Sequence, residues 1–375
     1  MRINRKTILI LCTRALSIIA LVALASACDI PWLLTPEATI THTQQPTEIH
    51  TTLTSTPTPP VWISVYFSDP EDPESGSLRG GPDQALAEAI AQARLTIDVA
   101  IYDLNLWSIR DALLAAHQRG VDVRVVTESD NLDEMEIQEI SDSGILVLGD
   151  RREGLMHHKF VIIDRLEVWT GSMNFTLNGA YSNDNCLIRI RSSQLAENYL
   201  TEFEEMYVSD YFGTDSLQNT PNEQFSHDGI LMESYFSPDD QVANRILELI
   251  GNARESIAFM VFSFTSEDIA HALIERVGAG VLVSGVIEEG QYISSTYSQY
   301  DVLRGGGVDI RLDGNFRNMH HKMIIIDDEI VITGSYNFSN SAETRNDENI
   351  VVIHNGYIAA EFLDEFERVY EQAED

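Results

Sequence analysis

Apolar residues follow two alternating patterns along residues 61–375, and the same order of patterns occurs twice. Period-two runs rich in branched and aromatic residues predict β-strands, and runs with apolar residues three and four apart predict helices. In the first half the strands are Leu95–Tyr102 and Val121–Thr127, and the helices are Ala85–Ala93 and Ile109–Arg119. The second half repeats them as strands Ser256–Phe264 and Val281–Ile287 and helices Val242–Ala253 and Asp268–Val277. Alternating strands and helices predict an α/β architecture built twice.

Each half also opens and closes with matching segments. The remaining predicted strands are Tyr66–Ser68, Phe160–Ile163 and Val168–Thr170 in the first half, and Tyr235–Ser237, Met323–Ile326 and Ile330–Thr333 in the second. A terminal helix, Ser193–Met206 or Ile358–Glu371, completes each half, and Asp210–Gly229, poor in apolar residues, is the expected linker. We therefore expect two repeats, residues 61–215 and 228–375.

The duplication is explicit in residues 157–190, which align without a gap on residues 320–353 at a constant offset of 163. An internal repeat of this kind can bring both copies of its polar residues to one pseudo-symmetric cleft.

The N-terminal residues have the pattern of an export signal. Arg2, Arg5 and Lys6 precede an apolar run over residues 15–25 that is too short for a permanent membrane span. Residues 24–28, Leu-Ala-Ser-Ala-Cys, resemble a bacterial lipobox, with Ala25 where that pattern usually has leucine. We expect residues 1–28 to be a signal peptide, Cys28 to be lipidated, and the protein to be exported to the cell envelope, anchored or alternatively secreted.

Residues 29–60 are dominated by threonine and proline, which predicts a disordered tether. Cys12 lies in the signal and Cys28 is the lipidation candidate, so Cys186 is left as a lone core cysteine and no disulfide is expected.

Charge limits the classes of partner. The formal net charge is -35, from 59 acidic and 24 basic side chains. Such a surface repels polyanions and counts against a general nucleic-acid binder, which needs a basic stripe. It leaves room for a local cationic cleft. The acidic residues of the run 133–139 follow a helical face and are interpreted as solvated charge.

Residues 61–375 contain only two lysines, Lys159 and Lys322, each in a His-His-Lys segment. Because residues two apart in a strand share a face, His157 and Lys159 point together, as do His320 and Lys322. His158 and His321 point the other way and are expected to pack. Two histidines and two lysines meeting in one cleft would bind phosphate.

At identical spacing each motif is followed by Asp, Gly-Ser and Asn, and these residues carry a resemblance to the phospholipase D superfamily. The signature His-x-Lys-x4-Asp…Gly-Ser-x-Asn is matched twice: by His157, Lys159, Asp164, Ser172 and Asn174, and by His320, Lys322, Asp327, Ser335 and Asn337. The resemblance implies that family's fold, two duplicated α/β lobes with one active site at the pseudo-twofold interface. Because both half-sites are on one chain, we expect a monomer. No metal or other cofactor is expected, since the two lysine ammonium groups can neutralise the phosphate.

The family mechanism is one that these side chains could support. One neutral imidazole attacks phosphorus, and the other histidine protonates the leaving group and then activates water or an alcohol. The two lysines, with Asn174 and Asn337, balance charge on the phosphate oxygens. Asp164 and Asp327 are expected to fix turns through backbone amides, and Ser172 and Ser335 to bond phosphate or neighbouring motif residues.

An asymmetry divides the two halves. Where the family usually has an acidic residue, the second half has Glu348 and the first has Asn185. In relatives with this asymmetry the glutamate orients the first-half histidine, which makes His157 the nucleophile and His320 the acid. Asp184, beside Asn185, remains an alternative second carboxylate.

Three functions stay open. The leading one is a phospholipase D type hydrolase or transphosphatidylase acting on phospholipid, brought to a membrane by its lipid anchor. The second is a metal-independent endonuclease of the same superfamily, and the third is an inactive envelope binding protein. The sequence does not decide the lipid head group or the acceptor.

Overall fold

The computed structural model describes residues 60–373, all of which lie in one compact unit. The expected signal, Cys28 and nearly all of the predicted tether lie outside these residues. Within them no helix is both long and apolar enough to cross a bilayer.

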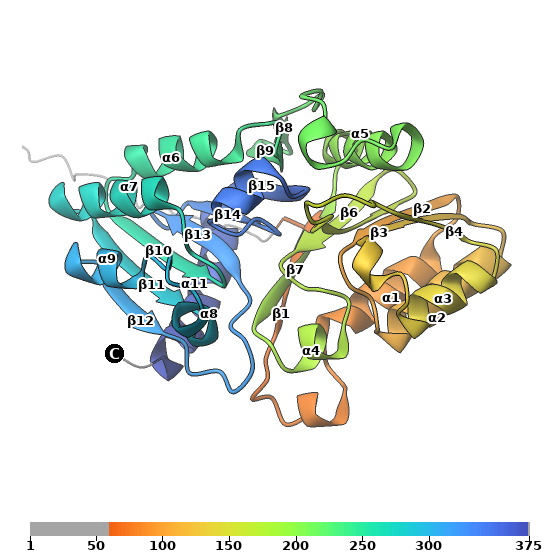
Figure 1. Cartoon of the computed structure of the whole chain (residues 1–375), viewed down its shortest axis with the longest axis horizontal. Coiled ribbons are helices and arrows are strands. Elements are labelled where there is room, and N and C mark those ends of the chain that lie inside the picture. The colour runs from red at the N-terminus through yellow and green to blue at the C-terminus, as the bar shows by residue number, and fades with distance from the viewer. Residues whose placement is uncertain (1–59, 374–375) are drawn as a thin grey trace, which may run out of the picture. The chain divides into compact units, whose positions relative to one another are not determined.

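Two mixed β-sheets form the framework, one from each half of the chain (Figure 1). Their strand orders match position for position, apart from one extra edge strand in the second. The first sheet runs β1 (Ile63–Ser68), β7 (Asn185–Arg191), β6 (Glu167–Gly171), β5 (Lys159–Ile163), β2 (Thr96–Ile101), β3 (Asp122–Thr127), β4 (Leu146–Gly149). The second runs β12 (Asp309–Leu312), β11 (Leu282–Ile287), β10 (Ser256–Val261), β13 (Lys322–Ile326), β14 (Ile330–Gly334), β15 (Glu348–His354), β9 (Ile230–Ser237), β8 (Gln224–His227). The predicted α/β class and the duplication into two lobes are confirmed.

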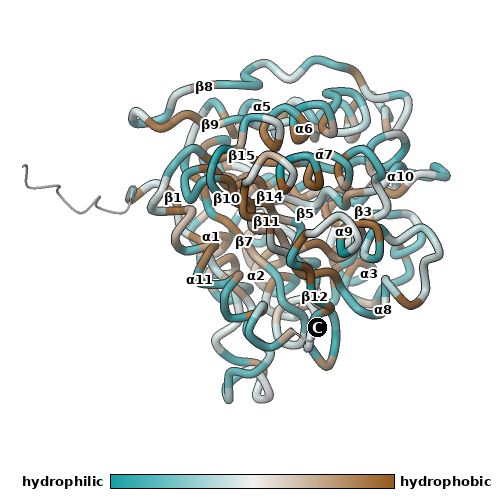
Figure 2. Tube along the Cα trace, turned by 90° about the vertical axis from the view of Figure 1, so that its left-hand side faces the viewer, coloured by the Kyte–Doolittle hydropathy of each residue, from teal (hydrophilic) through white to brown (hydrophobic). Residues whose placement is uncertain are grey.

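Helices cover both sheets because each sheet is apolar on both faces. The first half contributes α1 (Pro82–Gln92), α2 (Trp107–Gln118), α3 (Met135–Asp142), α4 (Leu177–Tyr181) and α5 (Ser193–Ser209). The second contributes α6 (Val242–Asn252), α7 (Glu267–Gly278), α8 (Glu289–Ser294), α9 (Tyr300–Gly305), α10 (Asn340–Thr344) and α11 (Gly356–Gln372). In Figure 2 the apolar stretches follow the inner strands and the polar stretches lie on the outer turns of the helices.

A shared core joins the lobes. One apolar cluster combines Phe160, Tyr199 and Phe203 of the first half with Phe236 and Phe362 of the second. Each lobe has a further core on its outer side, under α1 and α2 or under α6 and α7. The terminal helices α5 and α11 each pack on the sheet of their own half and also contact an edge-side strand of the other, β9 for α5 and β1 for α11, which joins the two lobes.

Two expectations were wrong. The predicted linker 210–229 contains β8, which pairs with β9 through Phe225 and Met232 at its edge of the sheet. Glu136, taken as solvated charge, is buried, and its carboxylate accepts a hydrogen bond of 3.0 Å from Trp107 Nε1. Both errors came from counting polar residues without knowing which neighbour supplies a partner.

Candidate active site

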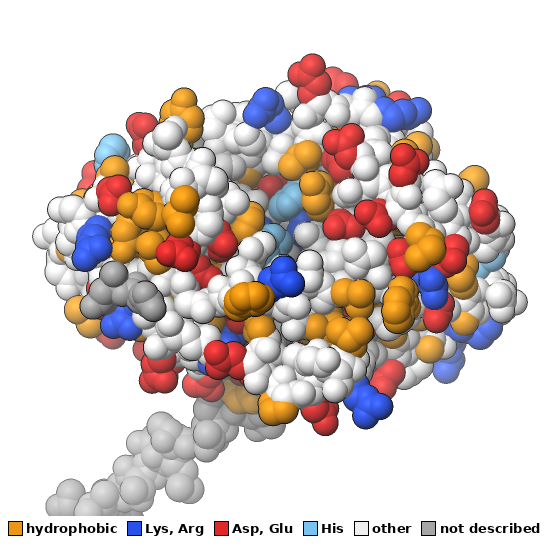
Figure 3. All heavy atoms as spheres, turned by 60° about the horizontal axis from the view of Figure 1, so that its bottom comes forward, with side chains coloured by type: hydrophobic (Ala, Val, Ile, Leu, Met, Phe, Trp, Pro, Cys, Tyr) orange, Lys and Arg blue, Asp and Glu red, His pale blue; other side chains and the backbone are white. Residues whose placement is uncertain are grey.

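The two motif histidines lie at equivalent ends of the sheets. Lys159, the first residue of β5, pairs with Ile101, the last of β2, and Lys322 of β13 pairs in the same way with Val261 of β10. His157 and His320 therefore lie at the carboxyl ends of these central strands. In the space-filling view of Figure 3, histidine side chains are visible in a hollow of this face.

The backbone of each histidine is bonded to the opposite lobe. His157 N donates to Asp347 O at 3.0 Å, and His320 N donates to Asp184 O at 2.8 Å. Short parallel bridges at Met156–Asp347 and Asp184–Met319 make the same two connections. The backbone of each half-site is therefore held in place by a strand of the opposite lobe.

The side chain of each motif histidine also bonds a residue of the opposite half of the chain. His157 Nδ1 lies 2.7 Å from Glu348 Oε2, and His320 Nδ1 lies 2.9 Å from Asn185 Oδ1. Asn185 Nδ2 donates to Gly179 O at 3.0 Å, which fixes the amide with its oxygen toward His320. Because a carboxylate or amide oxygen only accepts, both histidines carry hydrogen on Nδ1. Nε2 is then the nitrogen left for chemistry.

The two lysines are buried beside these rings. Lys159 Nζ donates to His157 O at 2.6 Å, and Lys322 Nζ donates to His320 O at 2.9 Å. Burial lowers the pKa of Lys159 to about 7 and that of Lys322 well below its usual value, with the charge of Lys159 adding to the effect on Lys322. Each ammonium group has three donors and one bond here, so donors remain for an anion.

The same burial keeps the histidines neutral. Desolvation, followed by the charges of the two lysines, lowers the pKa of His157 and of His320 well below the usual range. Burial raises the pKa of Glu348 to about 7, against the nearby charge of Lys159. A neutral imidazole with a free Nε2 lone pair is a competent nucleophile.

The amide groups of the motif are incompletely satisfied. Asn174 Oδ1 and Asn337 Oδ1 are buried and have no hydrogen-bond partner within the described residues. They occupy equivalent positions in the loops after β6 and β14. An amide oxygen only accepts, so these two atoms would be completed by a hydrogen-bond donor, whereas a phosphate oxygen would be bonded through the Nδ2 groups of the same amides.

The serines support the histidine partners. Ser172 Oγ donates to Asn185 Oδ1 at 2.9 Å and accepts from Cys186 N at 3.0 Å. Ser335 Oγ accepts from Asn349 N at 3.0 Å and lowers the pKa of Glu348 against the effect of burial. Gly171 and Gly334 come just before them, and a Cβ at either would collide with the backbone of the next strand. This close approach explains the Gly-Ser pair.

Asp164 and Asp327 lie away from the histidines. Each follows the far end of β5 or β13 and accepts from three consecutive backbone amides where β2 or β10 begins. The shortest of these bonds, to Leu95 N and Glu255 N, are 2.7 Å. Their bonding is to backbone amides, as expected, but it anchors a neighbouring strand and not only their own turn.

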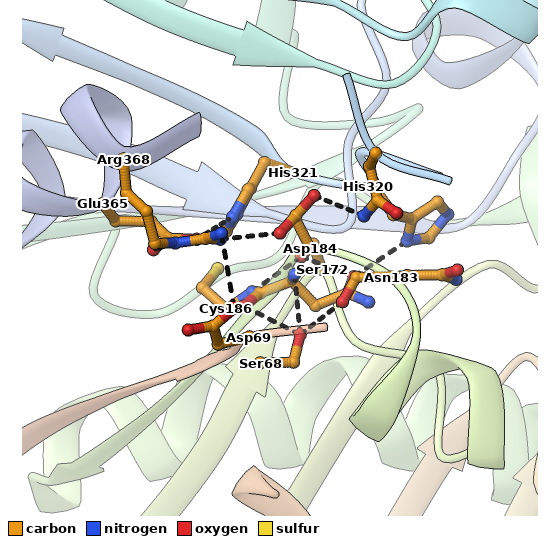
Figure 4. Close-up of polar contacts among 12 residues, drawn as sticks. Ser68, Asp69, Ser172, Asn183, Asp184, Cys186, His320, His321, Glu365 and Arg368 are labelled. Carbon is orange, nitrogen blue, oxygen red and sulfur yellow. Dashed lines mark hydrogen bonds and ion pairs between the residues drawn. The ribbon is translucent and has the colours of Figure 1, made fainter. Parts of the chain in front are cut away.

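Asp184 is not beside an imidazole. Its carboxylate makes a 2.6 Å ion pair with Arg368 and accepts from Asn315 Nδ2 at 2.5 Å. Figure 4 shows Asp184 between Arg368 and the backbone of His320. Asn185 therefore remains the only one of the two that bonds the His320 ring, and the geometry gives no support to Asp184 as the second carboxylate.

The second histidines are buried in the shared core, as expected. His158 Nε2 lies 2.9 Å from Glu202, and His321 Nε2 lies 2.9 Å from Glu365. Glu202 and Glu365, on α5 and α11, were not singled out from the sequence, although their 163-residue separation was a usable signal.

Two aromatic rings were also missed. Lys159 Nζ lies 5.2 Å from the ring centroid of Tyr102, and Lys322 Nζ lies 5.0 Å from that of Phe262. The same rings contact His157 and His320 edge-on at 4.9 and 4.6 Å. Each ring follows its central strand and forms a wall against which a lysine and a histidine are positioned.

A sizeable surface cavity lies away from the motif histidines. A cavity of about 590 Å³ lies on the outer side of the first sheet, lined by Tyr66, Trp169 and Arg189 among others. None of the motif histidines or lysines lines it, so we place the candidate site by its chemistry. Among the described residues no three histidine, cysteine or acidic side chains are grouped as a metal ion requires.

Comparison with known proteins agrees with this geometry. A family model described as "Cardiolipin synthase, PLD-like domain" matches residues 86–207 and 246–370, together more than half of the chain. The mitochondrial cardiolipin hydrolase of Xenopus tropicalis is 34% identical over 133 residues, which are 36% of this chain and 63% of that protein. The chain thus spans somewhat less than two thirds of the length of the first such relatives.

Two further matches extend the comparison. The phospholipase D of Rickettsia bellii is 30% identical over 163 residues, which are 42% of this chain and 81% of that protein. The crystal structure of phosphatidylserine synthase from Haemophilus influenzae superposes with a TM-score of 0.60 at 16% identity, covering 82% of this chain and 85% of that one. This last likeness shows the fold.

Proposed function

Since this chain belongs to the PLD-like domain family, and is thus a phosphodiesterase of the phospholipase D superfamily, we propose that it cleaves phospholipids. Its reaction is hydrolysis of a phosphodiester bond, or transfer of the phosphatidyl group to an alcohol, through a phosphohistidine. The observation that carries the proposed mechanism is the 2.7 Å contact between His157 and Glu348, opposite a neutral amide at His320.

The first step uses His157 as nucleophile. Its Nε2 lone pair forms a bond to phosphorus, and the bond from phosphorus to the leaving-group oxygen breaks. Nδ1–H remains bonded to Glu348, whose negative charge stabilises the positive phosphoimidazole. His320, once protonated on Nε2, gives that proton to the departing alkoxide.

The second step reverses the proton transfer. His320 Nε2 takes a proton from water or an alcohol, whose oxygen attacks phosphorus while the bond to His157 Nε2 breaks. An anionic phosphodiester between Lys159 and Lys322 offsets the charges that lower the pKa of His320, so substrate binding itself favours the protonated acid.

The lysines supply the electrostatic stabilisation. Their remaining donors, with the Nδ2 groups of Asn174 and Asn337, would donate to the nonbridging oxygens, on which negative charge builds. Because both ammonium groups are buried, their interaction with an anion is stronger than it would be in water.

Phospholipid is favoured over nucleic acid by charge. The net charge of -35 opposes the approach of a polyanion such as DNA, whereas a phospholipid in a membrane presents one head group at a time. Relatives named cardiolipin hydrolase and phospholipase D support the same choice.

The proposal includes location. We propose that residues 1–28 export the chain, that Cys28 is lipidated, and that residues 29–60 tether residues 61–375 near a membrane. Both half-sites are on one chain, and we propose that it acts as a monomer. Mass spectrometry of the membrane fraction should find a diacylated N-terminal cysteine. A secreted protein with an unmodified downstream N-terminus would refute the anchor alone.

The experiment that tests the function is a side-by-side assay on phosphatidylcholine, cardiolipin and plasmid DNA with a chelator present. We expect release of a phosphatidyl product from lipid and no nicking of the plasmid. Cleavage of DNA alone would assign the chain to the endonucleases of the superfamily. Failure on all three substrates, with tight retention of lipid, would indicate an inactive binding protein.

A further inference from the structure

Exposed aromatic side chains gather on one end of the described molecule. Among the large apolar residues that are more than half exposed, three are aromatic: Trp107, Tyr297 and Phe316. Trp107 begins α2, directly after the carboxyl end of β2. Tyr297 follows β11 and α8, and Phe316 lies between β12 and His320. All three therefore belong to the edge of the sheets at which the motif histidines lie.

Aliphatic residues of similar exposure occur at both ends of the strands. Leu95, Leu146 and Leu282, at 70%, 71% and 77%, lie where β2, β4 and β11 begin, at the opposite end of the strands. Ile293 in α8, at 73%, lies on the histidine end. The exposed aromatic residues named above are thus confined to one end of the strands, whereas exposed aliphatic residues occur at both ends.

The second-lobe members are structurally linked to the site. Asp313 accepts a 2.7 Å hydrogen bond from Glu289 N, which ties the start of α8 to the loop 313–319. That loop leads directly into His320, and its Asn318 O accepts from Asp184 N at 3.0 Å. Ile293, Tyr297 and Phe316, here called the apolar rim, thus lie on two connected segments beside the cleft. Figure 3 shows apolar side chains on this face around the hollow that holds the histidines.

The charges near the rim restrict its partner. Exposed charges of both signs lie on this end of the sheets: the acidic residues include Asp130, Asp133 and Glu289, and the basic residues include Arg151, Arg152 and Arg317, the last beside Phe316. No basic excess is present there to attract a polyanion, and the net charge of -35 on the whole chain opposes DNA and strongly anionic bilayers. Exposed aromatic and branched side chains are what proteins insert at the boundary between head groups and acyl chains.

We propose that the apolar rim inserts into the surface of a net-neutral phospholipid bilayer and brings the cleft over the lipid head groups. This rests on the proposed function and adds to it a route to the membrane that is separate from Cys28. The three side chains, at 73%, 77% and 92% exposure, enter the interface while the acidic residues around them stay in water. Extraction of a lipid is then unnecessary, because the scissile phosphate already lies at the depth of the head groups.

The first test compares vesicle and monomeric substrates. The full-length chain carries Cys28→Ser in every sample, so that lipidation contributes to none. Ile293→Ser, Tyr297→Ser and Phe316→Ser together should lower turnover of phosphatidylcholine vesicles about tenfold or more. Turnover of a short-chain phosphatidylcholine below its micelle concentration should be unchanged. The matched control is Leu95→Ser, Leu146→Ser and Leu282→Ser, which should leave both rates unchanged.

The second test locates the contact without relying on activity. Phe316→Trp should show added fluorescence quenching on vesicles of phosphatidylcholine with brominated acyl chains, and Leu282→Trp should not. Equal quenching at both positions, or equal vesicle rates for the rim and control variants, would overturn the proposal. So would a dimer in the absence of lipid that the rim substitutions dissociate, since a second copy would then be the occupant. If no lipid is cleaved in any form, the proposed function fails while the quenching still decides the rim.

Discussion

The two half-sites share a backbone arrangement and differ in charge at one position, the residue that bonds Nδ1 of each histidine. Both histidines bond across the lobe interface through Nδ1, both lie against an aromatic ring, and both precede a buried lysine. The atom facing His157 belongs to a carboxylate and the atom facing His320 belongs to an amide. The two histidines therefore have similar geometry but differ by one formal charge beside the ring. A nearby negative charge stabilises an imidazolium, so the two rings should differ in how well they bear a positive charge.

The largest effect is expected from removing either histidine, and the two removals should differ in kind. His157→Ala should lose at least about 10⁴-fold in rate with every substrate, because no nucleophile remains. His320→Ala should lose the lipid reaction but keep its first step on a nitrophenyl diester, whose leaving group needs no acid. Mass spectrometry should then find a phosphoryl adduct on His157. An adduct on His320 in the reciprocal variant would reverse the assignment.

Removing either lysine should test whether the lobes contribute equally to phosphate binding. Lys159→Met and Lys322→Met should each lower turnover by roughly 10²- to 10³-fold, the usual effect of losing one preorganised charge. Methionine preserves most of the buried volume, so the circular dichroism spectrum should not change. Near-native turnover in either variant would refute the two-lysine site.

A second difference between the halves concerns the lobe interface. Asp184 forms an ion pair with Arg368, whereas the equivalent Asp347 bonds Gly213 N, and burial raises its pKa well above the usual range. Glu205 occupies the position equivalent to Arg368. Arg368→Met should destabilise the fold by about 3 kcal/mol, because it leaves a buried carboxylate unpaired. Glu205→Gln is the matched control and should change the free energy of unfolding by less, as measured by urea denaturation.

The partners of the histidines should sharpen the comparison further. Glu348→Gln keeps the hydrogen bond to His157 but removes the charge, and should lower the rate roughly 10- to 100-fold. Asn185→Ser should cost less than about tenfold, since only the orientation of His320 is lost. A larger loss at Asn185 would place the nucleophile in the second half.

Close to neutral pH, the most gradual change in rate is expected from pH itself. Glu348 must be ionised, and with a pKa of about 7 its contribution is lost as the pH falls through that value. Lys159 must be protonated, and its contribution is lost as the pH rises through about 7. The rate should therefore be greatest near neutrality and fall by up to about tenfold per pH unit on each side. In Glu348→Gln the acid limb should disappear, and the alkaline limb should move to lower pH because the charge of Glu348 raises the pKa of Lys159.

Much of the fold and of the site was predictable because each rests on a periodic or repeated signal. The strand and helix alternation gave the class, and the constant offset of 163 identified the paired residues, including the contact partners Glu348 and Asn185. Short strands such as β4 and β8 were missed because few residues carry their pattern. Tyr102 and Phe262 were missed because a ring at the end of a strand looks like any core residue until its lysine neighbour is known.

The crossing of the two halves has a consequence for inheritance. In a symmetric pair of identical chains, any substitution at the position of Asn185 would appear twice and would change both histidines together. A single chain that carries the repeat twice escapes this restriction, because Asn185 and Glu348 are encoded separately. Each copy can then mutate alone, while Asp184 O and Asp347 O still hold the opposite histidine through main-chain atoms that no substitution removes. In a chain that carries both repeats, positions 185 and 348 can therefore change independently, whereas in a symmetric pair of identical chains the two equivalent positions always change together.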